Sequence, residues 1–130
     1  MNARGTFEIT MQAEPPFDVE GAVALGRATF DKRFSGALTA ESRVHMLSCL
    51  DGARKAGAYV AMERIRGTLE GKSGSFVVAH LGERTEQSQS LTVLIAPGSG
   101  TGELAGIRGR MQIEIVEGQH FYEIDWHFES

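Results

Sequence analysis

Apolar and polar residues alternate along most of this chain, and a period of two is typical of a β-strand with one buried face. Between residues 4 and 13, for example, Phe7, Ile9 and Met11 fall on one face and polar residues fall on the other. The same alternation predicts further strands over residues 25–34, 58–65, 75–81, 90–96, 110–116 and 120–128.

The stretch from residue 38 to residue 50 fits two structures. Val44, Met46, Leu47 and Leu50 have the spacing of a short helix, whereas alternation between two faces fits a strand equally well. We predict a strand, because the chain on either side reads as a continuous meander of strands.

Eight predicted strands with short connections define the fold class. Pro15 and Pro16 interrupt the first connection, because proline cannot donate to a strand ladder, and residues 18–23 are predicted to be irregular. No substantial helix is expected. An open sheet would leave two unpaired edges, which closure into a barrel removes. We therefore predict one domain, residues 1–130, that forms an all-β, eight-stranded antiparallel barrel with room inside for side chains or one small ligand.

Composition and charge narrow the classes of function. The formal net charge is −4, and no more than two Lys or Arg residues are adjacent, which argues against a nucleic-acid partner. The single Cys49 cannot form an internal disulfide or a cysteine-rich zinc site. The chain has no apolar run long enough to span a membrane and no signal-peptide core. We therefore expect a cytoplasmic protein with no membrane partner.

Two glycine-rich segments, residues 65–76 and 97–109, connect predicted strands. Glycine suits chain reversal and close backbone approach. The run from Gly98 to Gly102 is superficially similar to a phosphate-binding loop. A P-loop, however, needs a lysine and a helix directly after it, and neither follows here. The segments are therefore predicted to be turns that close strands.

Residues 5–10, 63–76 and 97–109 together resemble a bacterial family called domain of unknown function 3224. That family is similar in fold to the allene oxide cyclase and dirigent barrels, so the resemblance implies an eight-stranded barrel, which is often oligomeric in the relatives. It implies no established activity. Phe7-Glu8-Ile9 resembles the first strand of allene oxide cyclases, whose Glu takes part in catalysis, but nothing around Cys49 matches their catalytic Cys. A cyclase is not predicted.

A site inside the barrel would need carboxylates or histidines that point inward, where burial shifts their pKa. The candidates are Glu8, Glu63 and His80. Glu63 is in phase with Tyr59, and His80 is in phase with Phe76 and Val78. A Glu–His pair on adjacent strands could transfer a proton. The structural alternative is a salt bridge from Glu63 to an Arg and a histidine that only packs in the wall.

Other conspicuous residues favour structural roles. The spacing of His45, His120 and His127 matches no metal signature, so no metal site is predicted. Cys49 is expected to act as a small apolar residue. The stripe that contains Tyr122 and Trp126 is interpreted first as core and second as an oligomer interface.

Three functions remain. The first is a barrel that binds a small apolar or mixed ligand in its lumen, and the second is an isomerase or cyclase-like enzyme that uses the inward carboxylates and His as acid and base. The third is a structural, homo-oligomeric barrel with a filled lumen. No motif predicts a cofactor. The expected ligand contacts are Glu8, Tyr59, Glu63, Phe76, Val78 and His80.

Overall fold

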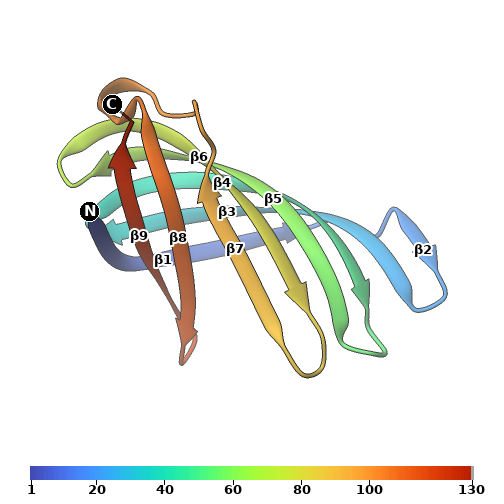
Figure 1. The fold of residues 1–130 in the computed structure, drawn as a ribbon. Helices are drawn as coiled ribbons and strands as arrows, with labels where there is room; N and C mark the ends of the chain where they lie inside the picture. The colour runs from blue at the N-terminus through green and yellow to red at the C-terminus, as the bar shows by residue number, and fades with distance from the viewer. Residues whose placement is uncertain (130) are drawn as a thin grey trace.

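The computed structural model describes residues 1–129, and they form one antiparallel sheet that closes on itself (Figure 1). The strands pair in the order β1-β9-β8-β7-β6-β5-β4-β3, and β3 pairs with β1 to close the ring. The predicted all-β, eight-stranded antiparallel barrel is therefore confirmed. The elements are β1 (Asn2–Ala13), β2 (Asp18–Glu20), β3 (Val23–Gly36), β4 (Leu38–Asp51), β5 (Ala56–Leu69), β6 (Lys72–Arg84), β7 (Gln89–Ile95), the 3-10 turn η1 (Gly102–Leu104), β8 (Ile107–Val116) and β9 (Gln119–Phe128).

Two of the uncertain segments now have a definite structure. The stretch over residues 38–50 is the strand β4, as predicted, and the helical alternative is wrong because both edges of β4 pair with neighbouring strands. The expectation that residues 18–23 are irregular is wrong in part. After the two prolines, the chain folds back as the short strand β2, which pairs with the start of β3 outside the barrel ring.

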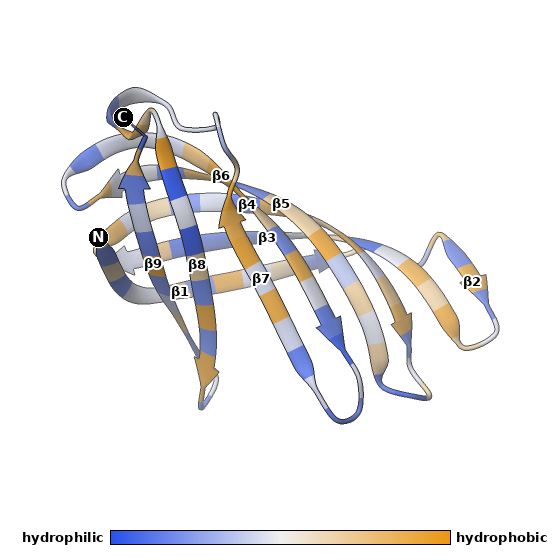
Figure 2. Cartoon of the chain, viewed as in Figure 1, coloured by the Kyte–Doolittle hydropathy of each residue, from blue (hydrophilic) through white to orange (hydrophobic). Residues whose placement is uncertain are grey.

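One end of the barrel, which we call the closed end, is filled with apolar side chains. The turn η1 lies across this end, and its Leu104 is buried in the core (Figure 1). Colouring by hydropathy shows the alternation of apolar and polar residues along the strands (Figure 2). The core side chains with at most 1% exposure that fill this half include Phe34, Leu38, Ile65, Leu69, Phe76, Ile95, Ile107 and Ile124.

The glycine-rich segment after β7 completes this end by pairing with the edge of β6. The Thr101 N–H donates to the Ser75 carbonyl at 2.8 Å, and the Ser75 N–H donates to Oγ1 of Thr101 at 3.0 Å. The hydroxyl of Ser99 accepts from the Val77 N–H in the same way. A Cβ atom at Gly100 would clash with the carbonyl of Leu104, so only glycine fits there. These contacts support the prediction of a structural turn.

The opposite end, which we call the open end, flares because β7 and β8 separate. Only two residue pairs join these strands, Val93 with Met111 and Leu94 with Arg110. Toward the turns at the lower edge of Figure 1, the two ribbons diverge. Inward-facing apolar side chains in this half therefore keep contact with solvent: Leu91 is 41% exposed and Ile115 is 62% exposed. Within residues 1–129, no helix has the length and apolar character needed to cross a membrane.

Candidate functional site

A group of four polar side chains, three buried and one half-buried, lies inside the barrel where the filled half meets the open half. Glu63 on β5 is its centre, with no exposed surface. Its Oε1 accepts a hydrogen bond from Lys32 Nζ on β3 at 3.2 Å and one from His80 Nε2 on β6 at 2.9 Å. Its Oε2 accepts a hydrogen bond from the Ser42 hydroxyl on β4. We call Lys32, Ser42, Glu63 and His80 the polar cluster.

The cluster forms because four neighbouring strands each place one polar residue in an otherwise apolar inward row. Burying an isolated charge in such surroundings is costly, and pairing with hydrogen bonds offsets the cost. The ammonium of Lys32 has the carboxylate on one side and aromatic faces on the other. Its Nζ lies 4.7 Å from the ring centre of Phe7 and 5.8 Å from that of Phe34. The pair is thus neutral overall and held in place from several directions.

The surroundings of Glu63 keep it ionised. Burial alone would raise its pKa, but the hydrogen bond from His80, the charge of Lys32 and the hydrogen bond from Ser42 together lower the pKa below its ordinary value. An ionised carboxylate can only accept, so the hydrogen-bond network assigns a proton to Nε2 of His80. In the neutral imidazole, Nδ1 is then the bare acceptor.

Tyr59 connects the polar cluster to the open end. Its ring lies directly over Gly82 of the next strand, where any Cβ atom would clash with it. Partial burial, and then the nearby charge of Glu63, raise the pKa of Tyr59. Within residues 1–129, the Tyr59 hydroxyl and Nδ1 of His80 have no hydrogen-bond partner, and both atoms keep contact with solvent.

Toward the open end, the inward-facing positions of the strands carry mainly apolar side chains, and we call six of these residues the mouth. Each faces inward, because it alternates with outward-facing residues in phase with the buried core of its strand. Lys32 and Glu63 lie nearer to the closed end along β3 and β5 than the mouth residues Phe30 and Tyr59 do. The mouth consists of Met11, Phe30, Met46, Tyr59, Leu91 and Ile115.

The structure brings together some of the predicted residues and separates others. The predicted proximity of Glu63 and His80 on adjacent strands is confirmed by their 2.9 Å hydrogen bond. The inward placement of Glu8 is wrong: Glu8 is exposed on the outer face of β1, opposite Arg33, because its neighbours Phe7 and Ile9 take the inward positions. The predicted Arg partner of Glu63 is also wrong, since the partner is Lys32.

Phe76 and Val78 face inward as expected, but they are 1% and 0% exposed. They fill the barrel beside the polar cluster and present no free surface to a ligand. Tyr59 is the predicted contact residue that does reach the open end.

Lys32 and Ser42 are not among the residues predicted from the sequence, although the alternation contains a signal for both. Lys32 occupies the inward phase of Phe30 and Phe34, and Ser42 lies in phase with Ala40. A charged residue in an apolar phase is rare without a partner, so Lys32 could have been paired with an acidic residue elsewhere in the barrel.

Other predicted roles can also be placed. The stripe with Tyr122 and Trp126 faces inward and is buried, so its interpretation as core is confirmed and the interface interpretation does not apply. His45 and His127 are exposed, and His120 is half-buried next to Phe7. Among residues 1–129, no three His, Cys, Asp or Glu side chains are placed to hold one metal ion.

With the site described, comparison with known proteins adds the family. A family model described as "Protein of unknown function (DUF3224)" matches residues 3–126. The chain belongs to this family. A solved DUF3224 structure from Shewanella oneidensis MR-1, described as a protein with unknown function, is 40% identical. The match covers 100% of this chain and 98% of the Shewanella chain, with a TM-score of 0.93. A comparison with curated proteins gave no match. The DUF3224 description names no activity, so any function must be argued from the site.

Proposed function

We propose that this DUF3224 protein binds a small molecule through the mouth, with the polar end of the ligand at Tyr59 and His80. The observation that supports this is that Tyr59 Oη and His80 Nδ1 take part in none of the hydrogen bonds among residues 1–129 and lie beside the mainly apolar inward positions of the open end. Small-molecule sites characteristically combine an apolar wall with a few convergent polar groups.

The chemistry of the site favours a neutral ligand with an apolar body. Lys32 is already matched by Glu63, so the polar cluster offers no net charge to attract an ion. Nδ1 of His80 accepts a hydrogen bond, and the Tyr59 hydroxyl can donate or accept one. A hydroxyl group on the ligand can use both, and a carbonyl can use Tyr59 alone. We therefore expect hydroxylated ligands to bind more tightly than ligands that cannot donate.

Calorimetric titration with 4-pentylphenol and its methyl ether tests this proposal. The phenol can donate to His80 and the ether cannot, while their apolar bodies are nearly the same. One hydrogen bond is worth about 1 kcal/mol, so we expect the phenol to bind roughly five- to tenfold more tightly. Tyr59→Phe should weaken both ligands to a similar extent, because either oxygen can accept from the Tyr59 hydroxyl, and should leave the preference in place.

Matched variants locate the binding. Leu91→Asp places a charge in the mouth and should abolish binding. Val116→Asp places the same charge on an equally exposed residue, 46% against 41%, that faces outward, and it should leave binding unchanged. Absence of binding to both probes would contradict the proposal and favour a structural barrel whose lumen is only filled.

A second function, proton transfer, is favoured by one specific contact. Glu63 holds His80 through Nε2 at 2.9 Å and leaves Nδ1 bare toward the mouth, which is how a carboxylate orients a histidine base. The likeness to allene oxide cyclase barrels, a prediction from the sequence, is in keeping with this alternative. His80 would act as the base, and Tyr59 could donate to an oxygen that gains charge.

A generic proton-abstraction probe, 5-nitro-1,2-benzisoxazole, separates this alternative from simple binding. A base removes its C3 proton as the N–O bond breaks, which gives a coloured cyanophenolate without any other reactant. Enzyme chemistry predicts a rate above that of buffer alone, which Val116→Asp should keep and His80→Gln should lose. A rate that is the same in wild type and His80→Gln would exclude His80 as the base and leave the binding proposal intact.

A further inference from the structure

The outer surface of the barrel carries a continuous apolar area that the proposed ligand site does not use. It lies on four adjacent strands, β4 to β7, and it consists of two rows of cross-strand partners. The first row is Leu47, Val60 and Leu81, and the second row is Met62, Ala79 and Leu94. We call these six residues the outer patch.

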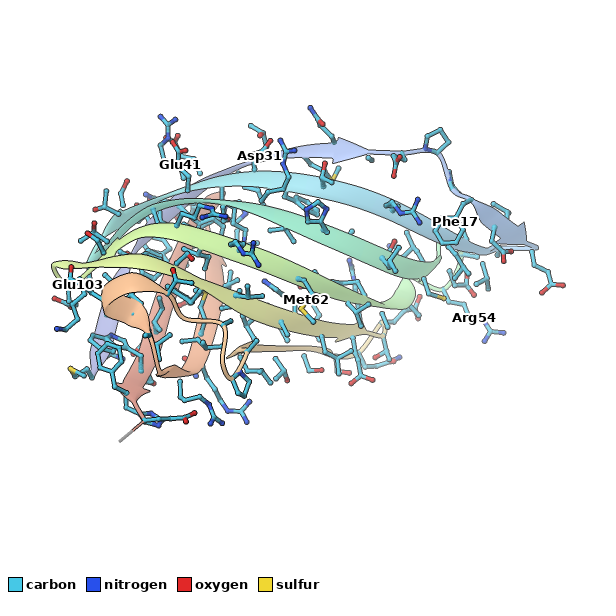
Figure 3. The ribbon with its side chains drawn as sticks, turned by 90° about the horizontal axis from the view of Figure 1, so that it is seen from above. Phe17, Asp31, Glu41, Arg54, Met62 and Glu103 are labelled. Atoms are coloured by element: carbon cyan, nitrogen blue, oxygen red, sulfur yellow. The ribbon has the colours of Figure 1, made fainter. Side chains whose placement is uncertain are left out.

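The outer patch is exposed where polar residues are expected. Leu47 is 46%, Val60 51%, Met62 57% and Leu81 50% exposed. Single exposed apolar residues are ordinary, but a contiguous group on one face marks an interaction surface. Met62, on β5, is labelled in Figure 3. The surface around it is hollowed by an open groove of about 570 Å³ that both rows help to line.

Opposite charges lie on either side of the outer patch. Arg64 follows Met62 by two residues on β5, and Glu83 follows Leu81 by two residues on β6. Each therefore sits one row outside the patch, at opposite ends. None of the ion pairs among residues 1–129 involves either residue. Arg64 stands directly opposite Arg43 on β4, whose guanidinium is paired with Asp31.

We propose that the outer patch is the interface of a homodimer. The two-fold axis lies in the plane of the interface and crosses the strands between the two rows. This axis keeps each strand over the same strand of the partner, so Val60 lies on Met62 and Leu81 lies on Ala79. At the two sides, Leu47 meets His45 and Leu94 meets Thr92. The same rotation places Arg64 over the row of the partner that contains Glu83. The centre of the surface thus pairs apolar residues with apolar residues, and its edges bring Arg64 next to Glu83 of the partner, as an isologous contact requires.

The size of the surface indicates a dimer of modest strength. Four strands at about 4.8 Å and four rows at about 6.8 Å give a projected area of roughly 500 Å² on each copy. A standard stable interface removes about 800 Å² of accessible surface from each partner. The accessible area exceeds the projected area because side chains are rough, so the interface falls at the lower end of the stable range. We therefore expect a dimer that dissociates on dilution.

Sedimentation velocity from low micromolar to near-millimolar concentration tests the proposal. The wild-type chain should shift from monomer to dimer and no further. Val60→Glu should remain monomeric at the highest concentration, because a carboxylate would be buried against apolar side chains. Val116→Glu, an outward valine of similar exposure on β8, should dimerise as the wild type does.

Charge reversal tests the arrangement of the two copies. Arg64→Glu or Glu83→Arg alone should weaken the dimer severalfold, and the two changes in one chain should restore it, since the charges then exchange places. A wild-type chain that stays monomeric, a trimer, or a dimer that Val60→Glu does not affect would overturn the proposal. A double variant weaker than either single one would overturn the stated axis. Circular dichroism on each variant confirms that it is folded.

Discussion

Replacing Glu63 by Gln tests the account of the polar cluster most sharply. The two side chains have nearly the same shape, so the change removes the charge and leaves the packing intact. The amide oxygen can still accept from Lys32 and His80, and Ser42 can rotate to accept from the amide nitrogen. What is lost is the negative charge beside the ammonium of Lys32, whose side chain is 5% exposed.

The expected cost is large because the charge left behind is buried. Removing one partner of a buried ion pair typically destabilises a protein by about 3–5 kcal/mol. The matched control is Glu41→Gln, whose carboxylate pairs with Arg33 on the outer face and is 73% exposed. Exposed pairs contribute at most about 1 kcal/mol. A double variant, Lys32→Met with Glu63→Leu, should recover most or all of the lost stability.

Urea unfolding followed by circular dichroism measures these differences, and its pH dependence gives a second check. The pKa of Glu63 is lowered in the folded state, so its ionised form contributes stability above the ordinary value of 4.5. That contribution is lost as the pH falls below 4.5 and through the lowered pKa. The gap between wild type and Glu63→Gln should therefore narrow in acid. A cost of less than about 1 kcal/mol for Glu63→Gln, no larger than for Glu41→Gln, would refute the buried ion pair.

Three further predictions concern a glycine in the turn after β7, a buried hydrogen bond of Tyr122 and the pKa of Tyr59. Gly100→Ala should lower the free energy of unfolding by several kcal/mol or prevent folding, because its methyl group would meet the Leu104 carbonyl. Gly52→Ala is the control: it has open space around it and should change the free energy of unfolding little. Tyr122→Phe should cost about 1–3 kcal/mol in the same unfolding assay, because it leaves the buried Leu38 N–H without its 2.8 Å acceptor. Burial and the charge of Glu63 raise the pKa of Tyr59, so ultraviolet titration should show Tyr59 ionising above the ordinary value of 10.0. Glu63→Gln should shift that ionisation toward lower pH. An unchanged titration in this variant would show that Glu63 does not act on Tyr59.

Much of the fold could be predicted from the sequence because alternation and turn residues are local signals. Strands such as β8 and β9 carry the period of two almost without interruption. The strand β2 could not be predicted in this way, because three exposed residues after two prolines have no apolar face. Its pairing with β3 depends on where the chain turns back, which is not a local property.

The site was less accessible to prediction for a related reason. Glu63 and His80 could be placed together because both lie in apolar phases of neighbouring strands. Glu8 lies in the polar phase of β1, and this alternation places it on the outer face. The resemblance of Phe7-Glu8-Ile9 to a catalytic strand pointed the other way. The open end follows from how few residues of β7 pair with β8, which only the three-dimensional register shows.

The most direct test of the central claim is a map of amide chemical shifts in a ¹H–¹⁵N spectrum during titration with 4-pentylphenol. Binding in the mouth predicts the largest shifts at Tyr59, His80 and Leu91, with saturation. Val60 and Met62 on the outer patch should move little. Saturable shifts centred on those outer residues, or no saturable shifts at all, would contradict the claim that the open end of the barrel is a ligand site.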